Sequence, residues 1–284
     1  MILKEAISLG NLKIGNHETM LILSHLTGLD RGSIILNDAN QLPNPNLFME
    51  FLDRRLSGEP LQYILGTWEF MGYTFKTDAR ALIPRPETEQ LVELATEFIK
   101  NEFAKKCKQD KPLRIMDLCT GTGCIAISIA LLSASANISV EIIAVDKSAP
   151  ALALARENAE LLGVTDVVTF IESDLFNSVT QTDFHAIISN PPYIPSLDVL
   201  ALDPVVQNHE PHMALDGGDD GLDFYRIIAP QAKKRLRPGG GLFLEIGPAQ
   251  VADILKTTGF TDVKLINDYA NLPRMVAGIK AEPH

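Results

Sequence analysis

The chain has 284 residues, which is enough for about two compact units, one of them with a three-layer core. Its composition, 46% hydrophobic and 21% charged, is typical of a globular protein and excludes a disordered or fibrous one. The formal net charge of -11 opposes long-range attraction to nucleic-acid phosphates, although it leaves room for a local basic patch.

The longest apolar run is Cys124 to Leu132, broken only by Ser128. It is much shorter than the roughly 20 residues that span a bilayer. Residues 1–10 carry Lys4 and Glu5 and contain no separate apolar stretch with a cleavage site of small residues, so we expect no signal peptide. The sequence therefore predicts a cytoplasmic protein with no membrane partner.

The three cysteines, Cys107, Cys119 and Cys124, are odd in number and widely spaced. We expect all three to be reduced and to act as small apolar residues. A zinc site would need more convergent ligands, because His209 and His212 lie far along the chain. No bound metal is expected.

Apolar residues recur at helical spacing over residues 1–57, without strand-like alternation. Breaks fall at residues 28–32 and at Pro43-Asn44-Pro45-Asn46, which stops one helix and supplies an N-cap for the next. We expect a small helical domain here. Over residues 58–86, aromatic residues gather among turn residues and predict a β-hairpin connector, with Trp68 and Phe70 packing against the larger domain.

Strand-like and helical segments alternate over residues 87–284, as in an open, mostly parallel sheet with helices on both faces. Seven strands are predicted over residues 113–118, 140–145, 167–171, 184–189, 241–246, 263–267 and 274–279. Helices are predicted over residues 87–104, 124–132, 149–162, 222–236 and 248–257, with Pro238-Gly239-Gly240 as a strong stop. The expected fold class is α/β: a Rossmann-like seven-stranded domain, a small N-terminal helical domain and a β-hairpin connector.

A segment with two glycines, Asp117-Leu118-Cys119-Thr120-Gly121-Thr122-Gly123, joins the first strand of this sheet to its helix. Glycines there let the backbone approach a ligand, but a lone glycine pair is a weak signal. Asp146 ends the next strand, where a carboxylate can accept both hydroxyls of a ribose. Asp174 follows the third strand within reach of an adenine amino group, and Leu175 could cover the adenine face. The alternative is that both aspartates only cap strand ends.

Two cofactor classes fit a glycine loop followed by a ribose-binding acid. A nicotinamide cofactor needs a pyrophosphate site and usually a second nucleotide-binding half, which the sequence does not show. A sulfonium cofactor has no pyrophosphate and tolerates a looser glycine loop. We therefore expect S-adenosyl-L-methionine.

The fourth strand runs directly into Asn190-Pro191-Pro192-Tyr193. The two prolines fix the backbone and remove two N–H donors, so the loop offers the Asn190 side-chain oxygen and backbone carbonyls as acceptors. Such acceptors attract an NH2 group, and Tyr193 supplies a flat face on which an amide or a base can stack. The plainer alternative is a proline-rich turn after a strand.

An amide nitrogen is a poor nucleophile, so the protein must hold it in line with the methyl–sulfonium bond and stabilise the positive charge that develops on it. The sulfonium methyl group is already electrophilic, so neither a metal nor a general base with a shifted pKa is obligatory. The sequence thus predicts a methyltransferase that acts on a planar amide or amino nitrogen.

Several ordered motifs together resemble the PrmC (HemK) family of protein-(glutamine-N5) methyltransferases, from about Glu59 to the C-terminus. They are the 117–123 loop, the Asn190–Tyr193 loop, Gln62-Tyr63-Ile64-Leu65-Gly66, Pro84-Arg85-Pro86-Glu87-Thr88-Glu89, Glu210-Pro211 with Ala214-Leu215-Asp216-Gly217-Gly218-Asp219-Asp220-Gly221-Leu222, and Leu244-Glu245-Ile246-Gly247. The resemblance implies methylation of the glutamine in the Gly-Gly-Gln motif of class-1 peptide chain release factors, and so a role in translation termination. It makes residues 1–57 the expected substrate-docking domain, although they match the family in helical character more than in sequence.

The resemblance also implies roles for individual residues. Asn190 and Pro191 accept the glutamine NH2 hydrogens, and Tyr193 packs against the amide beside Pro192. The residues implied to line the cofactor are Cys119, Thr120, Gly121, Thr122, Gly123, Asp146, Leu175 and Asn190. This chain departs from the family pattern at Cys119, where glycine is frequent, and at Leu175, where some relatives have an aromatic residue.

Three other functions stay open. A methyltransferase for a ribosomal-protein glutamine would carry the same Asn-Pro-Pro-Tyr loop. An adenine-N6 nucleic-acid methyltransferase would satisfy the same acceptors, but the acidic chain disfavours it and no direct nucleic-acid partner is expected. A decayed cofactor-binding adaptor is disfavoured because the chemical residues are intact. Arg85 and Glu87 either close over the cofactor, or Pro86-Glu87 only starts a helix. His209-Glu210-Pro211-His212 is expected to shape the mouth of the substrate site.

Overall fold

The computed structural model describes residues 1–105 and 111–282, so the prediction for Cys107 lies outside the described residues. The chain forms two compact units. Unit 1 comprises Met1–Thr67 and Asp203–His209, and unit 2 comprises Trp68–Leu202 and Glu210–His284. The domain boundaries after residues 57 and 86 remain a proposal. No helix within the described ranges is long and apolar enough to cross a bilayer.

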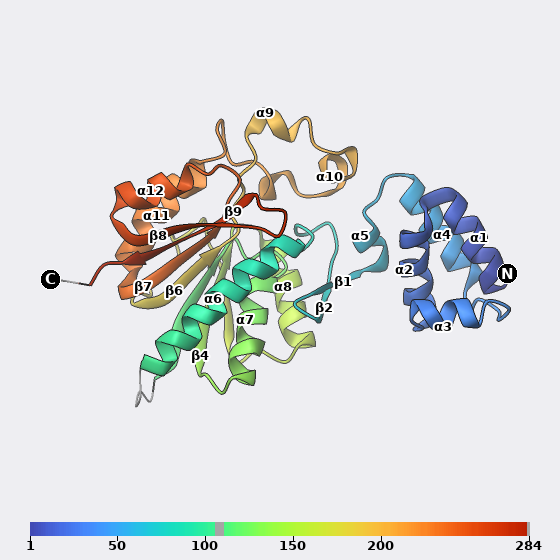
Figure 1. Cartoon of the computed structure of the whole chain (residues 1–284), viewed down its shortest axis with the longest axis horizontal. Coiled ribbons are helices and arrows are strands. Elements are labelled where there is room, and N and C mark those ends of the chain that lie inside the picture. The colour runs from blue at the N-terminus through green and yellow to red at the C-terminus, as the bar shows by residue number, and fades with distance from the viewer. Residues whose placement is uncertain (106–110, 283–284) are drawn as a thin grey trace. The chain divides into compact units, whose positions relative to one another are not determined.

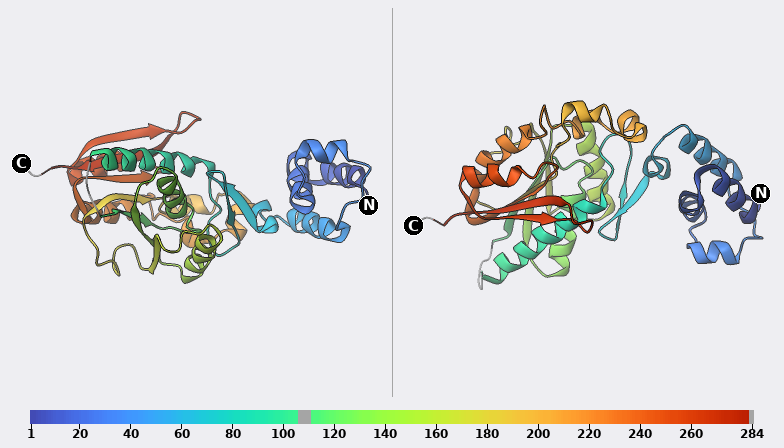
Figure 2. Two further views of the ribbon diagram at one scale, coloured as in Figure 1. Left: turned by 90° about the horizontal axis from the view of Figure 1, so that it is seen from below. Right: turned by 45° about the horizontal axis from the view of Figure 1, so that its top comes forward.

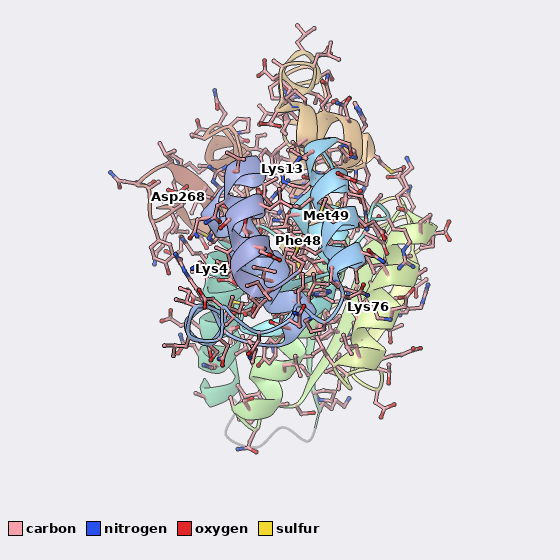
Figure 3. The ribbon with its side chains drawn as sticks, turned by 90° about the vertical axis from the view of Figure 1, so that its right-hand side faces the viewer. Lys4, Lys13, Phe48, Met49, Lys76 and Asp268 are labelled. Atoms are coloured by element: carbon pink, nitrogen blue, oxygen red, sulfur yellow. The ribbon has the colours of Figure 1, made fainter. Side chains whose placement is uncertain are left out.

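Unit 1 is helical, as the sequence predicts (Figure 1). Its helices are α1 (Leu3–Ile14), α2 (Asn16–Thr27), α3 (Arg31–Leu36), α4 (Pro45–Leu56), α5 (Leu61–Leu65) and α10 (Pro204–His209). The predicted N-cap is confirmed, because the Asn44 side chain accepts a hydrogen bond from the Leu47 N–H at 3.3 Å. Phe48 on α4, labelled in Figure 3, is fully buried in the core of this unit. The expected break at residues 28–32 is shorter than predicted, because Asp30 caps α3 through the Ser33 N–H.

The predicted hairpin is confirmed as β1 (Thr67–Phe70) and β2 (Tyr73–Lys76). It is shorter than the segment assigned to it, because part of that segment forms α5, which ends at Gly66 in the left-handed conformation. Phe70 packs edge-to-face on Phe75 with ring centroids 6.0 Å apart, and both rings are buried in the core of unit 2. The expected packing role thus holds for Phe70, whereas Trp68 is only half-buried.

Unit 2 contains the predicted seven-stranded sheet, in the order β5-β4-β3-β6-β7-β9-β8. The strands are β3 (Leu113–Leu118), β4 (Val140–Asp146), β5 (Val168–Glu172), β6 (Phe184–Ser189), β7 (Leu236–Glu245), β8 (Phe260–Asn267) and β9 (Pro273–Lys280). β3 to β7 are parallel, whereas β9 runs antiparallel to both β7 and β8, which lie side by side with it at one edge in Figure 2. Pro238-Gly239-Gly240 belongs to the irregular start of β7, since the preceding helix has already ended at Arg235.

Helices cover both faces of the sheet (Figure 1). They are α6 (Pro86–Lys105), α7 (Cys124–Ser135) and α8 (Ala149–Leu161) on one face, and α11 (Asp223–Arg235) and α12 (Val251–Thr258) on the other. Successive residues of a strand point to opposite faces, so Ile115 enters the core beneath α6 and α7 while Met116 enters the core beneath α11 and α12. Both faces of the central strands are therefore buried, which explains why β3 and β6 are nearly continuous apolar runs.

The strand order changes direction at β3, which lies between β4 on one side and β6 on the other. At such a topological switch point the loops that follow neighbouring parallel strands diverge and leave a crevice at the carboxyl ends. The glycine loop after β3, Asp146 at the end of β4 and Asn190 after β6 all lie at this edge. The fold thus gathers the predicted functional residues in one place. Short helices α9 (Ser196–Val199) and η1 (His212–Ala214) follow in the loop beyond Asn190.

Candidate active site

A cavity of about 180 Å³ opens at the carboxyl edge of the sheet in unit 2. Most of the residues predicted from the sequence line it: Cys119, Thr120, Gly121, Thr122, Asp146, Asp174, Leu175, Asn190 and Pro192. Gly123, Pro191 and Tyr193 are not part of this lining. Arg85 also lines the cavity, together with Ile83, Met213 and Phe224 from other parts of the unit.

The loop after β3 turns through three residues in the left-handed region, Cys119 (φ 59°), Gly121 (φ 54°) and Gly123 (φ 82°). A Cβ atom at Gly121 would meet no atom within 4 Å, so the backbone here is open to a ligand. A Cβ atom at Gly123 would lie 2.9 Å from the Ile127 Cδ1 atom, so this glycine serves the close packing of α7 instead. Cys119 adopts a backbone conformation that favours glycine, which makes its side chain a source of local strain.

Asp146 holds the glycine loop with its carboxylate. One oxygen accepts the Gly121 N–H at 2.9 Å and the other accepts the Ser148 N–H at 2.9 Å. Burial raises the pKa of this carboxyl above its ordinary value, and backbone hydrogen bonds from Ser148, Gly121 and Lys147 oppose that rise. Each carboxylate oxygen retains a further lone pair, so two hydroxyl groups of a ligand could still donate to Asp146.

Asp174 lines the cavity from a solvent-exposed position. Its carboxylate pairs with the Lys147 ammonium group at 3.2 Å, and both side chains are more than half exposed. Leu175 beside it is buried and adopts a left-handed backbone (φ 50°), which directs the chain around the cavity wall. The aspartate and the leucine thus present a polar group and an apolar surface at the same end of the cavity.

Asp117 is a buried acid that the sequence reasoning left without a role. Its Oδ2 atom accepts hydrogen bonds from the Thr120 hydroxyl at 2.5 Å and from the Ala126 N–H at 3.2 Å. Its Oδ1 atom is buried and has no hydrogen-bond partner among the described residues. Burial raises the pKa of Asp117 to about 7. Burial also raises the pKa of the neighbouring Cys119 thiol far above its ordinary value, so that this thiol stays neutral.

Asn190 is held by a chain of buried polar side chains behind the loop. Its Nδ2 atom donates to the Thr88 hydroxyl at 3.2 Å, and that hydroxyl donates to Glu245 Oε2 at 2.6 Å. The Tyr193 hydroxyl donates to the other Glu245 oxygen at 3.3 Å. The sequence motifs contained Thr88 and Glu245, but gave them no individual role. One sequence feature could have identified Glu245: it is an acid that directly follows the apolar residues of a buried strand, at the same edge of the sheet as Asp146.

Three glycines make room for the Tyr193 end of this loop. A Cβ atom at Gly217 would lie 2.7 Å from Tyr193 Cα, one at Gly221 would lie 2.3 Å from Tyr193 O, and one at Gly247 would lie 2.8 Å from Tyr193 Cδ2. Ile194 also pairs with Asp216 in a parallel bridge. The loop is therefore enclosed by backbone on several sides, and its position depends on the absence of side chains there.

A partly buried ion pair between Arg85 and Glu210 holds the segment that begins at Glu210. The Arg85 guanidinium group contacts Glu210 Oε1 at 2.6 Å, and the Glu210 side chain is 1% exposed. Arg85 therefore both lines the cavity and holds the following loop, while its carbonyl accepts the Thr88 N–H at the start of α6. Both alternatives considered for Arg85 are compatible with this arrangement. Within residues 1–105 and 111–282, no cluster of three or more histidine, cysteine or acidic side chains could hold a metal ion.

Two segments of the chain match known protein-family models. The family model described as the methyltransferase small domain matches residues 88–218, and the model described as the PrmC N-terminal domain matches residues 10–66. The chain thus contains a methyltransferase domain.

Curated relatives share most of the chain. It is 40% identical over 267 residues to the release factor glutamine methyltransferase of Geobacter sulfurreducens, covering 92% of this chain and 88% of that protein. It is 36% identical over 263 residues to the protein of the same name from Thermodesulfovibrio yellowstonii, covering 91% and 90%. The chain belongs to the release factor glutamine methyltransferase family, as the sequence motifs predict.

A solved structure supports the fold assignment. The catalytic domain of hMettl16, solved in complex with MAT2A 3'UTR hairpin 6, matches with a TM-score of 0.56 at 16% identity, covering 86% of this chain and 84% of that one. At this identity the match supports the fold alone. The predicted α/β class with a seven-stranded sheet is confirmed.

Proposed function

We propose that this protein transfers a methyl group from S-adenosyl-L-methionine to the side-chain amide nitrogen of the Gly-Gly-Gln glutamine in class-1 peptide chain release factors, in the cytoplasm and without a direct nucleic-acid partner. The names of the curated relatives support the substrate. The main structural support for methyl transfer to an amide nitrogen is the position of Asn190, which lines the cavity at the carboxyl end of β6.

The residues around the cavity fit the cofactor. Asp146 lies at the end of β4, where its carboxylate can accept the ribose hydroxyls, and Leu175 offers an apolar surface for the adenine beside Asp174. The open backbone at Gly121 permits close approach of the ligand. The buried Asp117 Oδ1 atom is one further acceptor on this loop that has no partner among the described residues. When bound, S-adenosyl-L-methionine supplies a methyl group made electrophilic by the positively charged sulfur.

Asn190 orients the amide nitrogen of the substrate in this proposal. Its Nδ2 atom is engaged by Thr88, which leaves Oδ1 as the atom available to accept an N–H of the glutamine. The partial negative charge of that oxygen also stabilises the positive charge that develops on nitrogen during transfer. After transfer the nitrogen releases one proton to water. Pro191 and Pro192 bring no N–H donors that would compete for the same acceptors.

Tyr193 contributes in this proposal by packing beside the amide, with its hydroxyl tied to Glu245. The ring is not part of the cavity lining in this structure. The loop thus combines an acceptor with a fixed support.

The experiment that tests the proposal is incubation with radiolabelled S-adenosyl-L-methionine and, separately, a class-1 release factor, a ribosomal protein mixture and duplex DNA. We expect label on the release factor, and no label when its Gly-Gly-Gln glutamine is replaced by glutamate. Label only on ribosomal proteins would favour the alternative protein-glutamine substrate. Label only on DNA would reject methylation of protein glutamine.

A further inference from the structure

We propose that Glu245 is a positioning residue that, through Thr88, determines which atom of the Asn190 amide faces the cavity, and that also holds Tyr193. This inference rests on the proposed function, because it concerns the same loop. It assigns a role to Glu245, which does not line the cavity, and to Thr88, which lines it beside Asn190.

The hydrogen-bond chain has a fixed direction when Glu245 is ionised. A carboxylate has no hydrogen to donate, so the Thr88 hydroxyl must donate to Glu245 Oε2, 2.6 Å away. With its only hydrogen committed, the hydroxyl can only accept from the next group, which is Asn190 Nδ2 at 3.2 Å. The amide of an asparagine is oriented by the partners available to its two ends. The Asn190 oxygen is thereby directed away from Thr88 and is available to the cavity.

The same carboxylate holds the other end of the loop. Glu245 Oε1 accepts the Tyr193 hydroxyl at 3.3 Å, so one buried side chain fixes both residues that flank Pro191 and Pro192. Glu245 itself is 1% exposed and extends from the end of β7, which lies between β6 and β9 in the sheet. Side chains that are locked by packing and by further hydrogen bonds hold a site more precisely than loop residues alone.

The electrostatic surroundings of Glu245 are mixed. Burial raises its pKa above the ordinary value, and the hydrogen bonds from Thr88 and Tyr193 oppose that rise. Arg274 on β9 lowers the pKa of Glu245 as a nearby positive charge, whereas Glu87 on α6 raises it. The two hydroxyls and the arginine thus compensate a carboxylate that would otherwise be costly to bury.

Thr88→Val tests the relay, because valine keeps the shape of threonine and removes the hydroxyl. We expect turnover to fall by about 10- to 100-fold, the scale for misplacing a catalytic group. Cofactor affinity should stay within about twofold of the wild type, because valine preserves the volume of this cavity-lining side chain. Thr88→Ser restores the hydroxyl and should recover most of the turnover. Glu245→Gln should behave like Thr88→Val, because its amide can donate to either hydroxyl and so removes the fixed direction.

Thr96→Val provides a matched control on the same helix. Thr96 is also buried on α6, and its hydroxyl has no hydrogen-bond partner among the described residues. This variant should keep wild-type turnover. Equal turnover in Thr88→Val and Thr96→Val, with an active wild type, would overturn the inference.

A readout independent of activity separates this inference from the proposed function. With ¹⁵N-labelled asparagine, the side-chain NH2 signal of Asn190 can be assigned by its loss in Asn190→Ala. We expect this signal to shift in Thr88→Val and in Glu245→Gln and to stay in place in Thr96→Val. An unmoved signal in Thr88→Val would reject the relay even if the protein methylates release factors. A shift in a protein without that activity would support the relay while rejecting the substrate.

Discussion

The side-chain amide of Asn158 pairs with both backbone groups of Lys76. Its oxygen accepts the Lys76 N–H at 2.7 Å, and its nitrogen donates to the Lys76 carbonyl at 3.2 Å and to the Thr122 carbonyl at 3.0 Å. Asn158 is fully buried on α8. One side chain therefore fastens the β1–β2 hairpin to the glycine loop of the cavity.

Replacing Asn158 by leucine should destabilise unit 2. The change removes three hydrogen bonds and leaves backbone groups of Lys76 and Thr122 without that partner, which costs about 3 kcal/mol of unfolding free energy. Asn158→Asp should also destabilise, because it places a carboxylate against two carbonyl oxygens. Urea unfolding of both variants measures the effect. Wild-type stability in Asn158→Leu would mean that the fastening contributes little.

Asn190→Ala should abolish most of the methyl transfer. It removes the acceptor proposed to orient the substrate nitrogen, so we expect turnover to fall by at least about 100-fold. The cofactor dissociation constant should change little, because the remaining lining is intact. Single-turnover assays with a release factor and calorimetry with S-adenosyl-L-methionine measure the two quantities. Unchanged turnover would refute the assigned role.

Asp146→Asn should weaken cofactor binding by about 10- to 100-fold, since hydrogen bonds to a charged group contribute about 1.5–3 kcal/mol. Burial raises the pKa of Asp146, so its carboxylate becomes protonated at a higher pH than an ordinary aspartate. Wild-type affinity should therefore fall as the pH is lowered through this raised pKa, and Asp146→Asn should not show that fall.

Calorimetric titration across pH tests the Asp146 prediction. Glu172→Gln is a matched control, because Glu172 ends the neighbouring strand β5 and is exposed outside the cavity lining. Equal affinities in Asp146→Asn and Glu172→Gln would exclude the ribose-binding role.

Asp117 should make the ligand-free protein less stable as the pH rises. Its pKa is about 7 in the folded protein against an ordinary value of 3.8, so the folded protein binds the proton more tightly than the unfolded chain does. The stabilising effect of this protonation is full below about pH 4 and is lost as the pH rises through about 7. Asp117→Asn lacks this ionisation.

The wild type should therefore lose unfolding free energy between pH 4 and pH 8, whereas Asp117→Asn should not lose this contribution. Relative to the wild type, the variant should gain a few kcal/mol of stability over this range. Urea unfolding at several pH values gives this difference. A constant difference across the range would show that Asp117 does not titrate there.

Gly221→Ala should displace the Asn190–Tyr193 loop, because its new Cβ atom would lie 2.3 Å from the Tyr193 carbonyl oxygen. We expect turnover to fall at least about tenfold, because a small displacement of catalytic groups causes a large loss of rate. Gly163→Ala is a matched control, since Gly163 has nearly the same backbone angle (φ 70° against 72°) and no atom within 4 Å of a new Cβ.

Both glycine variants should lose about 1 kcal/mol of stability from the left-handed backbone. Only Gly221→Ala should lose activity. Equal turnover in the two variants would mean that the loop tolerates the displacement.

Local sequence patterns predicted most of the elements correctly. Segments of five or six residues between turn residues predicted all seven strands of the large sheet. The signal is strongest for a strand such as β6, which is buried along its whole length and carries apolar side chains in both directions. An N-cap was predicted within Pro43-Asn44-Pro45-Asn46, because such a side chain satisfies a free N–H of the first helical turn within three residues. The structure assigns this cap to Asn44. Helix α5 was missed, because five residues are too few to show a helical period.

The positions of Asp146 and Asn190 at one edge could also be predicted, because parallel strands all end on the same side of their sheet. The sequence alone therefore determined the strand pattern, the glycine loop and the acidic and amide groups at the edge. It also contained Thr88 and Glu245, but without any pattern that linked them to Asn190.

Only the tertiary structure decided which side chains meet behind the loop. Thr88 and Glu245 are 157 positions apart in the chain, and Asn190 lies 102 positions from Thr88. Their contact exists because α6 packs across the sheet near the ends of β6 and β7. Periodicity and capping act over a few residues, whereas a hydrogen bond between distant residues depends on how whole elements pack, and that packing is fixed by the complete core.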